Sequence, residues 1–202
     1  SSFSIGWNAV EGATSYEVSL RERPAPYANP EQACVLREDF AKCWSKSTSL
    51  NSIANKLDNY TAKPGWTGSR LFTSSNYLKM GQGSNMGELT TPMLDTPLAD
   101  GLTIVLTLTP FGSSNKMTGS VRILLKSGNM QGSYDADGTQ TLIFTTPSIE
   151  EAYQVKLSPS TVCYISHFEV YDGVFSSEQL GIDDDDEDSG KQSIPMAGGK
   201  RS

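Results

Sequence analysis

Short runs of alternating apolar and polar residues, separated by Gly, Pro, Asn and Ser clusters, recur from residue 34 to residue 171. Alternation with a period of two is typical of half-buried β-strands. We therefore expect nine strands, at 35–40, 68–72, 77–80, 87–94, 102–109, 120–126, 139–145, 153–157 and 162–171. Many short strands without intervening amphipathic helices predict an all-β sandwich or barrel.

Helical signals are few. Residues 48–59 carry Leu50, Ile53, Ala54 and Leu57 and predict one short helix or a folded loop. Residues 174–181 combine a Ser N-cap candidate with a terminal Gly, which predicts one helical turn.

Both ends of the chain differ from this central region. Residues 3–10 and 15–20 alternate as two strands joined by a turn at 11–14, and three prolines in 21–31 favour an extended connector. Residues 183–188 are all acidic, and such a run repels itself and disfavours compact folding. We divide the chain into residues 1–31, a core domain at 32–182, and a disordered acidic tail or linker at 183–202.

The N-terminal segment has a recognisable motif. Trp7 to Tyr16 read W-N-A-V-E-G-A-T-S-Y, which resembles the middle strands of a fibronectin type III domain. The match covers only this strand pair, so the resemblance implies a partial domain.

The central region also resembles a known family. The segments 36–40, 57–66, 89–92 and 165–171 are similar to jelly-roll modules of bacterial, especially Bacteroidetes, surface proteins, including cleaved-adhesin and galactose-binding-like domains. The resemblance implies a jelly-roll β-sandwich whose first and last strands lie side by side. It also implies a secreted or cell-surface location and a glycan or a host or surface protein as partner, besides other domains of the same parent chain.

Charge and hydropathy exclude two partner classes. The net charge of −7 includes the six acidic residues at 183–188, and the remaining body has no Lys/Arg stripe to neutralise phosphates. We expect no nucleic-acid partner. No apolar run approaches the roughly 20 residues that span a bilayer, so we expect no membrane insertion.

Catalytic and zinc chemistry have little support. The three cysteines and the single histidine, His167, are scattered, whereas a structural zinc site needs about four paired ligands. Cys163 and His167 are four residues apart on a strand, or about 13 Å, which is too far for proton transfer. The acidic residues form no diagnostic carboxylate pair. If the first strand runs antiparallel beside the last, Cys43 lies near Cys163, and we predict a disulfide between them.

One carboxylate stands out because alternation places Glu38 between Leu36 and Phe40 on the buried side of its strand. A buried carboxylate needs a partner. An Arg or Lys is one candidate, and a bulge that exposes Glu38 is another. The resemblance adds a third, a structural Ca²⁺ held by Glu38 and Glu169. Apart from this calcium we expect no cofactor.

Aromatic side chains are the candidate ligand contacts, since β-sandwiches commonly stack sugars on exposed rings. We predict a binding site of Trp66, Arg70 and Tyr77, with core packing as the alternative for Trp66. The last strand changes phase between Ile165 and Phe168, which predicts a bulge at Ser166–His167.

The leading hypothesis is a non-catalytic adhesion or carbohydrate-binding accessory module of a larger bacterial surface protein. A structural spacer that positions another domain is the second hypothesis. A glycosidase or peptidase is the third, and it requires a carboxylate pair or a Cys–His contact that the sequence does not indicate.

Overall fold

A computed structural model describes residues 11–12, 14–15, 27–182 and 190–198. The strand pair predicted at 3–10 and 15–20 lies outside these described residues.

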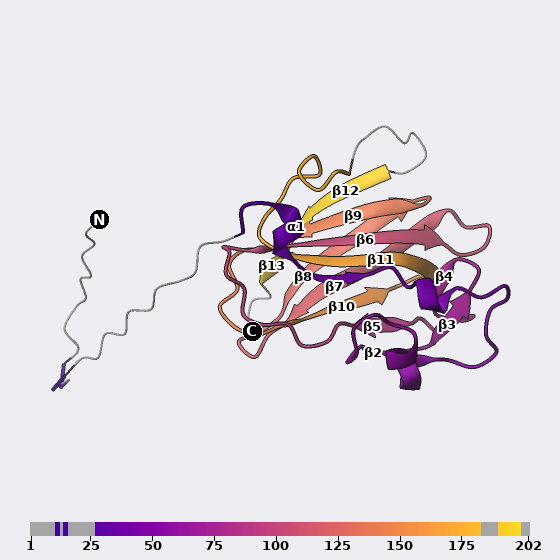
Figure 1. Ribbon diagram of the computed structural model, residues 1–202, viewed down its shortest axis with the longest axis horizontal. Coiled ribbons are helices and arrows are strands. Elements are labelled where there is room, and N and C mark those ends of the chain that lie inside the picture. The colour runs from indigo at the N-terminus through magenta and orange to yellow at the C-terminus, as the bar shows by residue number, and fades with distance from the viewer. Residues whose placement is uncertain (1–10, 13, 16–26, 183–189, 199–202) are drawn as a thin grey trace.

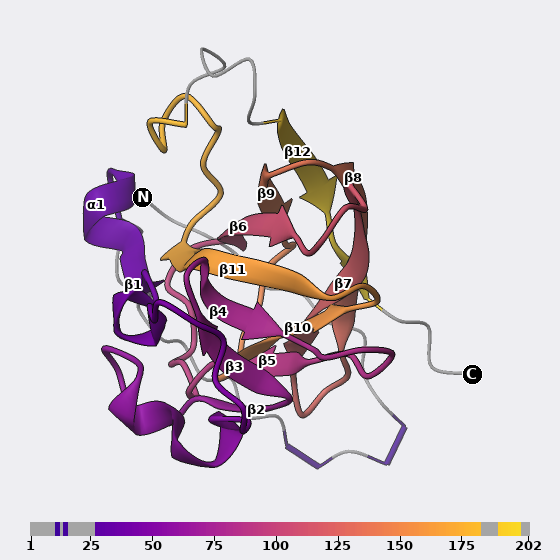
Figure 2. The same ribbon diagram turned by 90° about the vertical axis from the view of Figure 1, so that its right-hand side faces the viewer.

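Two β-sheets pack face to face (Figures 1 and 2). Sheet A has seven strands, in the order β12 (Gly190–Pro195), β9 (Gln140–Thr145), β6 (Leu102–Pro110), β11 (Cys163–Asp172), β4 (Tyr77–Met80) and β3 (Leu71–Ser74), with β1 (Cys34–Glu38) also paired to β11. Sheet B has six, in the order β13 (Ala197–Gly198), β8 (Met130–Asp137), β7 (Lys116–Leu124), β10 (Gln154–Pro159), β5 (Glu88–Thr90) and β2 (Thr67–Ser69).

The eight strands β4 to β11 form a jelly roll. Their order is β4-β11-β6-β9 in sheet A and β5-β10-β7-β8 in sheet B, and every pairing among them is antiparallel. The chain crosses between the sheets at each connection except β7 to β8, which stay together in sheet B. This arrangement confirms the predicted all-β sandwich and gives it jelly-roll topology.

The core lies between the two sheets because alternate side chains of each strand point inward. In β10 the buried positions are Val155, Leu157 and Pro159, and the residues between them are partly exposed. The largest fully buried side chains come from both sheets and from the segments beside them, and they include Tyr153, Phe40, Phe144, Phe168, Leu71, Leu89 and Leu106.

Strand β11, the last strand of the jelly roll, confirms two predictions. β1 pairs antiparallel with β11, with Glu38 opposite Phe168. The register between β11 and β6 shifts between Ile165 and His167, so Ser166 is bulged. Because of this bulge, Ile165 and Phe168 both face the core.

Two strand predictions were wrong. The segment predicted as one strand at 68–72 divides at Arg70, whose φ of 53° turns the chain, so that β2 and β3 belong to different sheets. β8 was not predicted at all. Its inward positions, Gly132, Tyr134 and Ala136, alternate correctly, but two of them are small and give a weak apolar signal.

Helical structure is short. The predicted extended connector ends in the helix α1 (Pro30–Ala33), which Asn29 caps by accepting a hydrogen bond from the Gln32 N–H. The candidate segment at 48–59 contains the 3₁₀ helix η2 (Ala54–Asn59), and another, η1 (Ala41–Cys43), follows β1. At 176–181 two reciprocal hydrogen bonds fix the predicted turn. The Gln179 side chain accepts one from the Ser176 N–H, and the Ser176 hydroxyl accepts the other from the Gln179 N–H.

The described part of the C-terminal segment is ordered into strands, so the prediction of a disordered tail was wrong for residues 190–198. β12 pairs in parallel with β9, and β13 pairs with β8. Met196, between the two strands, is buried in the main core, and its N–H donates to the Thr145 carbonyl at 2.8 Å. The short segment therefore bridges the edges of both sheets.

Met196→Ala tests this bridging role. Removing a buried Met side chain typically costs about 2–5 kcal/mol because a cavity remains. We expect the free energy of unfolding, measured by urea denaturation, to fall by about that amount, while Val174→Ala, at an exposed position, has little effect. Equal stability of Met196→Ala and the wild type would show that this segment does not pack on the core.

Candidate functional site

Trp66 belongs to the core. It is 4% exposed, and its ring packs edge-on against Phe40 and Phe168, with centroids 5.8 and 5.2 Å away. The predicted ligand contact at Trp66 was therefore wrong, and the alternative of core packing is confirmed. Its indole N–H has no hydrogen-bond partner among the described residues.

Arg70 and Tyr77 lie at opposite ends of the β3–β4 hairpin. The Arg70 carbonyl accepts from the Gly81 N–H at the open end, whereas Tyr77 pairs with Ser74 at the turn. These ends are about 13 Å apart by strand rise. The Arg70 guanidinium donates to the Met86 carbonyl at 3.1 Å. The structure does not bring Trp66, Arg70 and Tyr77 together, so the predicted three-residue site was wrong.

Glu38 and Glu169 point to opposite faces of sheet A, because Glu38 pairs with Phe168 while Arg37 pairs with Glu169. The predicted shared calcium site at these two residues was therefore wrong. The Glu169 carboxylate accepts hydrogen bonds from an Arg37 N–H at 3.2 Å and from the Tyr171 hydroxyl at 2.6 Å. Among the described residues, no group of three or more His, Cys, Asp or Glu side chains is placed to hold a metal ion.

Glu38 is buried, as predicted, but backbone groups satisfy it. One carboxylate oxygen accepts from the Phe40 N–H at 3.0 Å and the other from the Ala62 N–H at 2.6 Å. Burial raises the pKa of Glu38 above its ordinary value, and these two hydrogen bonds oppose the rise. The carboxylate thus ties the end of β1 to the segment at 62.

Glu38→Gln should destabilise the fold. The amide has one acceptor oxygen for two N–H donors, so one buried donor loses its partner at a cost of about 1–3 kcal/mol. We expect that loss in urea denaturation, whereas Glu88→Gln, which breaks a partly exposed pair with Lys156, should cost less than about 1 kcal/mol.

The same residue gives a pH dependence. A raised folded-state pKa means that the contribution of Glu38 to stability is present below its ordinary value of 4.5 and declines as pH rises through the folded value. The difference in free energy of unfolding between the wild type and Glu38→Gln should therefore narrow as the pH rises from 4.5 through the folded-state pKa of Glu38. A difference that widens with pH would contradict the direction of the shift.

All three cysteines are free thiols, so the predicted Cys43–Cys163 disulfide was wrong. β1 ends at Glu38, and Phe40, with φ 51°, turns the chain into η1 before Cys43 can continue the pairing with β11. Cys43 and Cys163 are both completely buried, and burial raises the pKa of each thiol to about 12. His167 is exposed, so it does not share the core position of Cys163.

Thiol accessibility should follow this burial. In native protein an alkylating reagent should modify Cys34 alone, and slowly, because burial raises the pKa of its half-buried thiol. In denaturant without reductant, intact mass should show three modified thiols. Recovery of a single reactive thiol under those conditions would indicate a disulfide after all.

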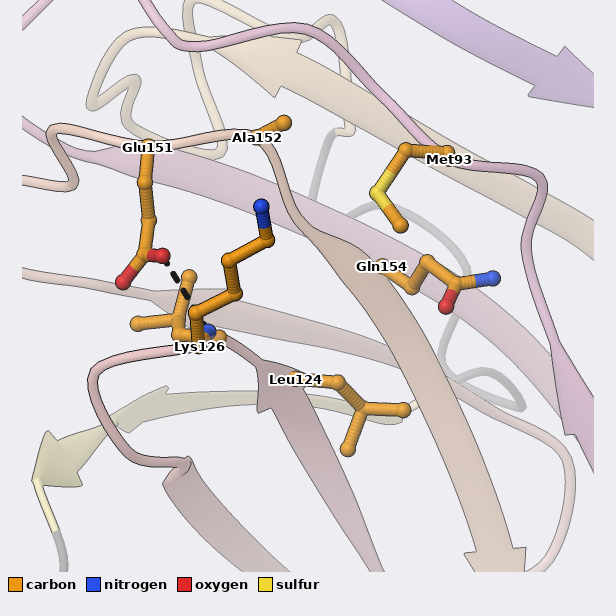
Figure 3. Close-up of a pocket in the computed structure, with 7 residues that line it drawn as sticks. Met93, Leu124, Lys126, Glu151, Ala152 and Gln154 are labelled. Atoms are coloured by element: carbon orange, nitrogen blue, oxygen red, sulfur yellow. Dashed lines mark hydrogen bonds between the residues drawn. The ribbon is translucent and has the colours of Figure 1, made fainter.

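A hollow of about 400 Å³ lies at one end of sheet B. Figure 3 shows Met93 and Gln154 on one side and Glu151 and Lys126 on the other, with Leu124 between them. The Glu151 carboxylate accepts hydrogen bonds from the backbone N–H groups of Lys126 and Ser127, each at 3.1 Å, and from the Ser127 hydroxyl. These bonds lower the pKa of Glu151 and fix the turn that follows β7. The hollow can accept an apolar group, but its polar contacts are mainly structural.

The outer side of sheet A is different, because exposed aromatic residues gather there. Leu78 and Met80 of β4 face the core, so Tyr77 and Lys79 point outward. Tyr77 is 38% exposed. Trp44, 57% exposed, forms an isolated bridge with Ser74, which itself pairs with Tyr77.

A second group of rings adjoins the first. Tyr164 of β11 pairs with Lys79 and contacts Phe111, with ring centroids 5.8 Å apart. Phe111, 42% exposed, also lies against the Lys79 ammonium, whose nitrogen is 4.1 Å from the ring centroid. These contacts hold two rings and a cation in one cluster beside Tyr77.

Hydroxyl and imidazole groups continue this surface across β6 and β9. Thr109 pairs with Tyr164, and Thr107 pairs with both His167 and Thr141. The Thr107 and Thr141 hydroxyls are 3.4 Å apart, and the Thr139 hydroxyl donates to Thr109 at 3.2 Å. We call the whole surface the open face; its members are Trp44, Tyr77, Lys79, Thr107, Thr109, Phe111, Thr139, Thr141, Tyr164 and His167.

Sequence reasoning identified only Tyr77 of this surface. One signal was available for the strand residues: Lys79 and Tyr164 alternate with buried neighbours, so their outward direction follows from period two. Trp44 and Phe111 lie outside regular strands, and their exposure depends on where loops meet the sheet. No local pattern gives that information.

Comparison with protein-family models and with curated protein sequences finds no match for this chain. None of the helices in the described part is long and apolar enough to cross a bilayer.

Proposed function

We propose that the protein is a non-catalytic glycan-binding module that serves adhesion or substrate targeting in a larger bacterial surface protein. The observation that carries this proposal is the open face, where three exposed rings, Trp44, Tyr77 and Phe111, share one side of a rigid sheet with several hydroxyl groups. A secreted or cell-surface location and additional domains in the parent chain belong to the same proposal.

The physical reason is the amphipathic character of sugars. Their rings present C–H groups that pack on aromatic faces, and their hydroxyls exchange hydrogen bonds with polar side chains. The open face offers both kinds of partner, because Tyr164, which contacts Phe111, pairs with Thr109 of β6, and Tyr77 lies on the other side of β11 from the threonine hydroxyls. A surface of this kind binds a chain laid across the strands rather than a small molecule in a deep pocket.

Anchoring on strands supports specificity as well as contact. Tyr77, Tyr164 and Thr107 come from three paired strands, whose backbone hydrogen bonds fix the spacing between them. Binding groups on a sheet lose little conformational freedom when a ligand arrives, which favours affinity.

A glycan array followed by titration calorimetry on a positive glycan tests the proposal. Trp44→Ala, Tyr77→Ala and Phe111→Ala should each weaken binding by roughly 2- to 10-fold, since ring contacts contribute about 0.5–1.5 kcal/mol each. Val174→Ala removes an exposed apolar side chain elsewhere and should leave affinity unchanged.

Two results would count against this function. Absence of binding to every glycan would favour the structural spacer, and binding that all three ring variants retain at full strength would move the site away from the open face. Unchanged thermal unfolding of the variants shows that any loss reflects the ligand contact.

A further inference from the structure

Lys79 occupies an unusual position for a lysine. It is only 7% exposed, although it lies on the outward side of β4. Phe72 of β3 and Tyr164 of β11 pair with it from either side, and Phe111 lies over its ammonium group. Directly paired residues on a sheet have Cβ atoms about 5 Å apart, so Phe72 and Tyr164 flank the Lys79 side chain, and Phe111 contacts its ammonium group.

No carboxylate among the described residues forms an ion pair or a hydrogen bond with the Lys79 ammonium. Lysine is rarely buried to this extent without an anionic partner. The ring of Phe111 provides a cation–π contact, which leaves the hydrogen-bonding capacity of the three N–H donors for other acceptors.

The carboxylates beside the open face already have partners. Asp39, which follows β1 next to β11, accepts a hydrogen bond from the Ala41 N–H at 2.9 Å. The described outward residues of the open face include the basic groups Lys79 and His167 and no Asp or Glu. The first carboxylate along the outer side of β11 is Glu169, which Arg37 and Tyr171 already engage. At the neighbouring corner, Asp135 pairs with Lys116 at 3.2 Å.

The sequence shows the same segregation. The chain has 23 Asp and Glu residues, yet the segments 40–57, 59–87, 101–134 and 152–168 contain none. These four segments supply Trp44, Tyr77, Lys79, Phe111 and Tyr164, together with the loops beside them. In a protein of net charge −7, these four segments therefore contribute no carboxylate to the open face.

From these observations we propose that the open face binds an anionic glycan, with an acidic group of the sugar paired to the Lys79 ammonium. This inference rests on the proposed glycan-binding function and names its ligand class. A uronic acid carboxylate and a sulfate ester both supply the required oxygen anion. The rings then pack on the sugar faces next to the charged group, and the threonine hydroxyls contact the neighbouring residues of the glycan.

The partly desolvated position makes this pairing selective. A charge-assisted hydrogen bond is about twice as strong as a neutral one, and the surrounding rings limit its screening by water. A neutral sugar leaves the ammonium without an anion and gains only the ring contacts. Discrimination between acidic and neutral glycans should therefore depend on this one side chain.

The test compares three polymers on the whole chain: a galacturonic acid polymer, the same polymer after reduction of its carboxyl groups, and a sulfated polysaccharide. We expect the wild type to bind at least one anionic polymer about tenfold or more tightly than the neutral polymer. Preference between the carboxylated and sulfated polymers identifies the acidic group. Raising the ionic strength from about 0.05 to about 0.5 M should weaken this preference.

Lys79→Met keeps an unbranched apolar stem among the rings and removes the charge, so it should abolish the preference for the anionic polymer. Lys79→Arg should retain much of it. Lys156→Met, on the outer side of sheet B, makes the same change of net charge and should have no effect. Equal melting temperatures of Lys79→Met and the wild type show that the loss is not a folding defect.

The outcomes separate the two proposals. If the neutral polymer binds as tightly as the anionic ones, and the ring variants weaken both, the glycan-binding function stands and the anionic ligand class is wrong. If Lys79→Met still prefers the anionic polymer over the neutral one as strongly as the wild type does, the proposed role of Lys79 is wrong. If none of the polymers binds, the result counts against both proposals.

Discussion

The bulge at Ser166 in β11 is the constraint on which the arrangement of sheet A depends. β11 pairs with β6 along one side, while on its other side β1 pairs with its second half and β4 with its first half. One extra residue shifts the alternation between these halves. Consequently Ile165 and Phe168 both enter the core, and Tyr164 and His167 both face outward. A regular strand would send one member of each pair to the wrong side.

The outer side of sheet A therefore has two different halves. Over one half, a small second core forms where α1 and residues 174–182 cover the sheet, and its buried members are Ala33, Val105, Ile143, Tyr171 and Phe175. The other half holds the open face, where Trp44, Tyr77 and Phe111 stay exposed although Phe72 and Lys79 between them are buried. Tyr171 and Tyr164 are seven residues apart on one strand, yet one is part of this small core and the other belongs to a half-exposed surface.

Sequence patterns predicted the features that depend on local alternation and failed for those that depend on tertiary contacts. Strand β4, the buried side of Glu38 and the bulge at Ser166 all follow from period two along the chain. The partners of Glu38 could not be predicted, because the Ala62 N–H reaches it from a loop 24 residues away. The same limit applies to Trp66, whose loop position is compatible with either core packing or exposure. The disulfide prediction extended the β1–β11 register beyond the point where Phe40 turns the chain.

Charge illustrates the difference between a global and a local property. The net charge of −7 argues against binding any anion when it is treated as uniform, but screening restricts each charge to a range of about 8–10 Å at physiological ionic strength. What a ligand experiences at the open face is set by its neighbours, and the described side chains there are aromatic, hydroxylated or basic. The acidic residues lie outside the four segments that supply most of this surface, and they include the run at 183–188. An acidic protein can therefore present a cationic site, provided that its carboxylates are excluded from one end of one sheet.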